Sequence, residues 1–177
     1  MLTGCSRGPA ETIAQPAKQE SSVSIVPLSE INLAAIGSIA PKGRVQDRDY
    51  NDLPIITSLI AHRNESIPYL ISKLEDETKI EGHTIDYWYE VRVGDVALII
   101  LTNFFKDSSQ NATIPGVSWD EFLARGAKRD LTGEQVLRNF ISKHGRREIR
   151  NRWQEIWREY QQRLFWDETE RCFRLRT

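Results

Sequence analysis

Three residues in the middle of the chain have side chains that could act together in acid–base chemistry or hold a metal ion. They are His83, Asp86 and Glu90, and an imidazole beside carboxylates can transfer protons in a hydrolase or ligate a divalent cation. The alternation of residues 85–91 predicts a strand, which places Asp86 and Glu90 on one face and leaves His83 in the preceding turn. Metal sites need three or four converging ligands. The sequence therefore favours an exposed polar rim over a catalytic or metal site.

Other catalytic signatures are missing from the sequence. No serine lies in a Gly-x-Ser-x-Gly turn, no glycine-rich phosphate loop is present, and Cys172 has no neighbouring base along the chain. His62 and His144 fall in the last turns of predicted helices, where a cation interacts favourably with the helix dipole. We therefore expect neither a cofactor nor a metal, and we favour a role other than catalysis.

The composition predicts one domain of ordinary size. The chain has 177 residues, of which 40% are hydrophobic, with a net charge of -1 and a pI near 6.3. Residues 23–177 suffice for a single core without a metal or disulfide, and no apolar run reaches the roughly 18 residues of a membrane-spanning helix. A nearly neutral chain also lacks the overall basic field that favours nucleic acid.

The N-terminus carries a short motif. Leu2-Thr3-Gly4-Cys5 resembles the lipobox of bacterial lipoproteins, and the resemblance implies lipid attachment at Cys5 and a location in the cell envelope. The basic and apolar regions that precede such a motif are missing from this sequence. Residues 1–22 otherwise have the polar, proline-containing composition of a flexible tether. The alternative is a chance tetrapeptide in the tail of a cytoplasmic protein, and membrane contact is expected only through this lipid.

Hydrophobic periodicity predicts a mainly α, irregular helical domain with about five to six helices and a small β-hairpin or two-to-three-stranded element. Asp52 and Ser66 are the expected caps of two helices that open with proline in the first turn. A helix that is apolar nearly all round follows Gly94-Asp95, and Gly145 separates the last two helices. The predicted elements are a short helix from residue 29, helices at 52–61, 66–74, 94–105, 132–145 and 146–163, a short helix that opens at Ser118, a strand at 85–91 and a hairpin at 165–175.

Residues 67–105 resemble a HEAT-type helical repeat. The first helix of the repeat matches Ile67-Pro68-Tyr69-Leu70-Ile71 and Leu74, its turn matches Asp76, its Val-Arg pair matches Val91-Arg92, and its second helix matches Ala97 and Leu101. Residues 77–90 form a longer connection than the repeat has, and no second complete unit is found, whereas a solenoid needs about three. The resemblance implies a HEAT-like helix pair and, by analogy of fold, an interaction role.

Charge is unevenly distributed along the chain. Between residues 65 and 95 there are eight acidic and three basic residues, whereas between residues 138 and 163 there are eight basic and three acidic ones. Either these two regions neutralise each other or each is merely solvated, which we favour, or each offers a docking surface for a charged partner. In the last case Arg146, Arg147 and Arg150 would bind the partner. Trp88, on the outward face of the predicted strand, is a further candidate contact with a partner or a sugar.

These features together predict an interaction or structural protein with a protein partner, located in a bacterial envelope if it is lipid-anchored. One alternative is a hydrolase with its site near His83, Asp86 and Glu90. The other is a cytoplasmic nucleic-acid-associated protein that inserts the arginine-rich helix at 146–163 into DNA as part of a helix-turn-helix. The buried aromatic face expected for that helix, with Trp153 and Trp157, argues against the last alternative.

Overall fold

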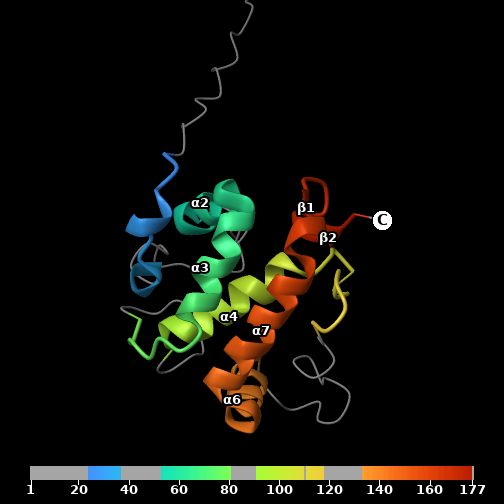
Figure 1. The fold of residues 1–177 in the computed structure, drawn as a ribbon. Coiled ribbons are helices and arrows are strands. Elements are labelled where there is room, and N and C mark those ends of the chain that lie inside the picture. Colours follow the sequence, from blue (N-terminus) through green and yellow to red (C-terminus); the bar gives the residue numbers. More distant parts are fainter. Residues whose placement is uncertain (1–23, 37–52, 81–90, 110, 118–132, 177) are drawn as a thin grey trace, which may run out of the picture.

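The computed structural model describes residues 24–36, 53–80, 91–109, 111–117 and 133–176 (Figure 1). These residues form a mainly helical fold with a small two-stranded antiparallel sheet, which confirms the predicted fold class. None of the helices in these ranges is long and apolar enough to cross a membrane. The helices are α2 (Pro54–His62), α3 (Ser66–Lys73), α4 (Val93–Phe104), α6 (Gly133–His144) and α7 (Arg146–Tyr160), and the strands are β1 (Leu164–Asp167) and β2 (Cys172–Leu175).

Helix α4 lies at the centre of the fold, where it packs against α3 (Figure 1). Its side chains are apolar nearly all round, and most of them are buried in one continuous core. A helix without a polar face has to be covered by other elements, so its position follows from its sequence. The helix begins one residue before the predicted start: Arg92 is the cap residue, and Asp95 accepts a hydrogen bond from its backbone N–H at 2.9 Å.

The cap residues predicted for α2 and α3 are both wrong. Proline lies in the first turn of α2 as predicted, but the cap residue is Leu53, which makes no side-chain capping bond. Ser66 is the first residue of α3 rather than its cap. Its buried hydroxyl donates backward to the Arg63 carbonyl at 2.6 Å, because a short 3-10 turn, Arg63–Glu65, joins the two helices.

The N-terminal residues 24–36 differ from the predicted single helix. They form two 3-10 turns, Leu28–Glu30 and Leu33–Ala35, and Ile31 between them is extended. Asn32 causes the break, since its side chain accepts a hydrogen bond from the Ala34 N–H at 3.0 Å and so starts the second turn.

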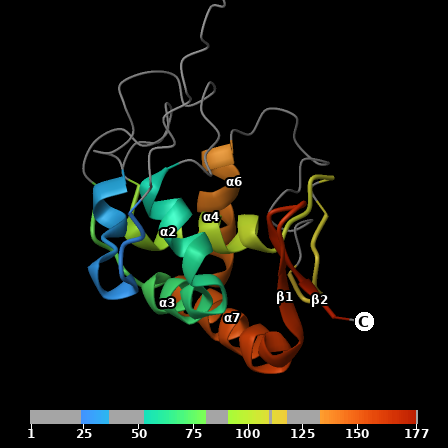
Figure 2. The ribbon, with the colours of Figure 1, turned by 90° about the horizontal axis from the view of Figure 1, so that it is seen from above.

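The last two helices and the hairpin agree closely with prediction. Gly145 separates α6 from α7 with φ of 78°, a conformation that L side chains rarely adopt. Helix α7 buries Ile149, Trp153 and Ile156 and ends at Tyr160, after which a 3-10 turn, Gln161–Arg163, leads into β1. Strands β1 and β2 pair antiparallel with Leu164 opposite Leu175. The hairpin and residues 24–36 lie at opposite ends of the molecule (Figure 2).

Two predicted elements lie wholly or mostly outside the described residues. The short helix predicted to open at Ser118 begins in the undescribed range 118–132, and the strand at 85–91 is described only at Val91. The base of the connection before α4 is described: Lys79 and Arg92 form an isolated antiparallel bridge, and the Ile80 N–H donates to the Val91 carbonyl at 3.0 Å.

Candidate functional site

A partly open pocket of about 110 Å³ lies where α4, α6 and α7 meet the loop at 116–117. Its walls come from elements that are far apart in the sequence, and most of the side chains that line it are apolar. The pocket is lined by Leu98, Thr102, Gly116, Val117, Phe140, His144, Glu148, Ile149, Arg152, Trp153 and Ile156.

The pocket exists because two helices diverge at one glycine. The turn at Gly145 directs α7 away from α6, and Phe140 on one helix and Trp153 on the other both line the pocket. Leu98 of α4 belongs to the central core and contributes to the wall from a third element. The pocket is therefore bounded by elements whose positions the core determines.

The mouth of the pocket is polar. The half-buried His144 ends α6 and its ring lies 4.8 Å from that of Phe140. The exposed Glu148 and the half-buried Arg152 follow on α7, and the Arg152 guanidinium donates to the Gly116 carbonyl at 2.8 Å. This bond attaches the loop at 116–117 to α7 and fixes one side of the opening.

A row of acidic side chains extends from the pocket along α7. Glu148, Glu155 and Glu159 are exposed and recur at seven and four residues, which places them on one side of the helix together with Arg152. Three carboxylates and one guanidinium give this edge a net negative charge. We call Glu148, Glu155 and Glu159 the acidic edge.

Two side chains that could act as nucleophiles, Thr102 and Cys172, are held by hydrogen bonds or buried. The Thr102 hydroxyl donates within α4 to backbone carbonyls at 2.9 and 2.8 Å, so it is held in the helix. Cys172 is a free thiol buried elsewhere, and burial raises its pKa to about 11, so it stays protonated at neutral pH. In the described ranges no three His, Cys, Asp or Glu side chains gather as a metal site.

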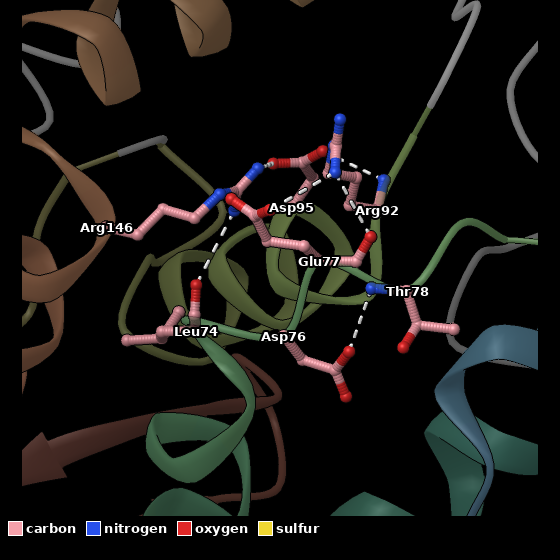
Figure 3. Close-up of polar contacts among 7 residues, drawn as sticks. All are labelled: Leu74, Asp76, Glu77, Thr78, Arg92, Asp95 and Arg146. Atoms are coloured by element: carbon pink, nitrogen blue, oxygen red, sulfur yellow. Dashed lines mark hydrogen bonds and ion pairs between the residues drawn. The ribbon is translucent and has the colours of Figure 1, made fainter.

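The predicted partner-binding arginines lie on the other side of α7, where two of them bind acidic groups of this chain. Arg146 donates to Asp95 at 2.7 Å and, at 3.5 Å, to the Leu74 carbonyl (Figure 3). The side chains of Arg146 and Asp95 are only 18% and 13% exposed. Arg150 pairs with Glu75 at 2.5 Å, whereas Arg147 is exposed to solvent. The basic helix and part of the acidic middle region thus neutralise each other, one of the alternatives that the sequence favoured.

Asp95 belongs to a polar junction at the start of α4 (Figure 3). Arg92 donates to the Glu77 backbone carbonyl at 3.2 Å, and the Gly94 N–H donates to the Asp76 carbonyl at 2.9 Å. Hydrogen bonds from Thr78 lower the pKa of the Asp76 carboxyl. These bonds fix the start of α4 against the end of α3 and the start of α7, so the junction has a structural role.

Several predicted site residues lie outside the described residues. They are Cys5, which is the predicted lipid attachment site, and His83, Asp86, Trp88 and Glu90. The structure therefore neither brings the proposed hydrolase residues together nor separates them, and these assignments remain predictions.

The sequence does not predict the pocket. The helix dipole accounts for His144 and core packing accounts for Phe140, and no local signal links them to Leu98 or Gly116. His144, Glu148 and Arg152 are spaced four residues apart, which is a helical spacing that could have indicated a shared site. Gly145, however, interrupts the helix between His144 and Glu148.

Comparison of the chain with models of protein families, with curated proteins and with solved structures found no match. The HEAT-type and lipobox resemblances remain predictions.

Proposed function

We propose that this protein is an interaction protein that binds a partner protein at the pocket between α4, α6 and α7. The partner inserts one apolar side chain into the pocket and places basic residues against the acidic edge. The single observation that carries the proposal is an apolar pocket of about 110 Å³ that opens beside an exposed row of carboxylates.

The size of the pocket favours a side chain over a larger ligand. Sites for drug-sized molecules have volumes of about 300–1,000 Å³, whereas an apolar cavity of about 150 Å³ accepts benzene. A volume near 110 Å³ suits one aliphatic or aromatic side chain. Apolar anchors in desolvated pockets supply most of the affinity at protein interfaces.

The acidic edge favours a basic partner. Exposed charges at the rim of an interface mainly accelerate association and exclude partners of the same sign. Because Arg146 and Arg150 already bind Asp95 and Glu75, the basic side of α7 has less free charge than its sequence suggests. The carboxylates beside the pocket are thus better placed than these arginines to select a partner.

Selection from a displayed library of random 12-residue peptides tests this proposal on the full chain. We expect enriched peptides to share one apolar residue flanked by lysine or arginine. The Ile156→Phe variant places a larger side chain in the pocket and should weaken their binding at least about tenfold, the loss of one apolar anchor. Ile80→Phe is the matched control, because Ile80 is half-buried but does not line the pocket.

Two outcomes would overturn the proposal. One is an absence of enriched peptides, and the other is equal binding of such peptides to the Ile156→Phe, Ile80→Phe and unaltered chains. A Glu155→Lys, Glu159→Lys double variant tests the charge argument separately, since it should slow association and reduce its dependence on salt while dissociation changes little.

We further propose that Cys5 is lipidated and holds the protein in a bacterial cell envelope. The support is the Leu2-Thr3-Gly4-Cys5 motif followed by a polar segment. The test is the mass of the N-terminal peptide from protein expressed with its native upstream region. A lipid on Cys5 would support the anchor, and an unmodified cysteine in soluble protein would contradict it.

A further inference from the structure

Arg152 lies between the pocket and the acidic edge on the surface of α7. Because α7 is a continuous helix, each residue is turned about 100° from the one before it. Ile156 lies about 40° to one side of Arg152, and Glu148 lies about 40° to the other side. The buried Ile149 and Trp153 of the pocket wall lie on the side of Ile156, and the rest of the acidic edge lies on the side of Glu148. The shortest way along the helix from the acidic edge to the pocket therefore crosses Arg152.

The guanidinium of Arg152 is fixed at this place. It donates to the Gly116 carbonyl at 2.8 Å, and both residues line the pocket. Arg152 is half-buried, whereas Glu148, which also lines the pocket, is exposed. Water screens an exposed charge more strongly than a partly buried one. For a side chain inside the pocket, the positive charge of Arg152 therefore outweighs the negative charge of Glu148.

The order of these groups decides which side chains of a partner enter the pocket. The acidic edge attracts lysine and arginine, but a cation that moved from the edge into the pocket would lose its water and approach a guanidinium of the same charge. A neutral apolar side chain meets neither cost, and it buries its surface against Ile149, Trp153 and Ile156. Specificity commonly depends on such a repulsive group as well as on attractive contacts.

We propose that Arg152 is the specificity-determining residue of the pocket: it excludes lysine and arginine from the pocket and so confines them to the acidic edge. This inference rests on the proposed function and adds the register in which the partner binds. The residue that the partner inserts is uncharged, and the basic residues that accompany it remain on the far side of Arg152, against Glu148, Glu155 and Glu159.

The size of the exclusion follows from the charge of Arg152. Two like charges about 5 Å apart at an effective dielectric constant of about 20 repel each other enough to change an affinity by roughly 100-fold or more. Because Arg152 is only half-buried, solvent reduces this effect. We therefore expect its charge to contribute at least about tenfold to the preference for a neutral side chain over lysine.

Equilibrium titration of the full chain with two matched peptides tests the proposal. One is the most enriched peptide of the library selection with norleucine at its apolar position, and the other has lysine there, so the two side chains are similar in length and differ in charge. In Arg152→Gln, which loses the charge but keeps a donor for Gly116, the preference for norleucine over lysine should fall at least about tenfold. Arg152→Lys keeps the charge and should keep the preference.

Arg158→Gln is the matched control. It removes the same charge from an exposed position of α7 that does not line the pocket, so the preference should change less than about twofold. An unchanged preference in Arg152→Gln, with both peptides still bound, would overturn this inference and leave the proposed function intact. An equal loss of both peptides in Arg152→Gln would also overturn it, because Arg152 would then only hold the loop at 116–117. If the unaltered chain binds neither peptide, the proposed function is refuted and this inference with it.

Discussion

Replacement of Gly94 by alanine tests the polar junction at the start of α4. A Cβ at this position would lie 2.5 Å from the Leu74 carbonyl oxygen and 2.7 Å from Nη1 of Arg146. The first contact is with backbone, which cannot move away as a flexible side chain can. Helix propensity alone favours alanine over glycine in a helix by about 1 kcal/mol. The two effects therefore predict opposite signs for the change in stability.

The net magnitude follows from three contributions. Overpacking costs about 1–3 kcal/mol. Displacement of Arg146 weakens its bond to Asp95, in which the two side chains are 18% and 13% exposed; we take about 1 kcal/mol for this after screening. Subtracting the gain in propensity leaves Gly94→Ala about 2 kcal/mol less stable, which corresponds to a melting temperature about 4–8 °C lower.

Urea unfolding followed by circular dichroism measures this difference. A double-mutant cycle with Arg146→Ala is the control, and the combined cost should be smaller than the sum because both changes remove the same contact. A Gly94→Ala chain as stable as the unaltered one, or more stable, would show that the close approach to Leu74 does not exist and would refute the reasoning.

Three further predictions concern single residues and pH. Arg63 has φ of 50° and ψ of -120°, so Arg63→Gly should relieve backbone strain and raise the free energy of unfolding by about 0.5–1 kcal/mol. Arg63→Ala keeps the strain and should lower the free energy of unfolding. Equal effects of the two substitutions in urea unfolding would refute this prediction. At the end of β1 and in the β-hairpin turn, hydrogen bonds from the Glu170 backbone, from Arg63 and from Ser108 lower the pKa values of Asp167, Glu168 and Glu170, respectively. The stabilising effect of these hydrogen bonds is therefore complete above the ordinary carboxyl pKa and is lost as pH falls below about 4. The urea midpoint should decrease when the pH is lowered from 6 to 3, and it should decrease less in Glu168→Gln. Burial raises the Cys172 pKa from an ordinary value near 9 to about 11, which lowers its thiolate fraction about 100-fold. In a Cys5→Ser chain at pH 8, a thiol reagent should therefore label Cys172 at least about 100-fold more slowly in the folded protein than in urea. Equal labelling rates would contradict the burial of Cys172.

The helices could be predicted because their causes are local. Pro54 and Pro68 lie in the first turns of α2 and α3, and the apolar residues recur at three and four positions within each helix. Gly145 ends α6 because the backbone there needs a positive φ. The hairpin follows similarly from alternation on either side of a polar turn. Each of these signals acts over a few residues and survives without knowledge of the rest of the chain.

Cap residues and the conformation of residues 24–36 could not be predicted in the same way. Serine is a residue type that often caps helices, but the 3-10 turn before Ser66 makes it the first helical residue. Residues 24–36 have a helical spacing of apolar residues, yet they form only two short 3-10 turns. The backbone groups of Val26 and Ile31 bind the side chains of Ser58, His62 and Tyr69. Tertiary hydrogen bonds outweigh a weak local preference when the segment is short.

By itself the sequence determined the helical class, the central place of α4 and the opposite charges of the middle and C-terminal regions. Only the tertiary structure decided which charges meet, since Arg146 reaches Asp95 and Arg150 reaches Glu75 across more than fifty residues. The pocket is likewise a property of three packed elements, because Leu98, Phe140 and Trp153 converge only after folding. Periodicity and propensity record what each segment buries, whereas a binding site depends on the distances between segments, which packing alone establishes.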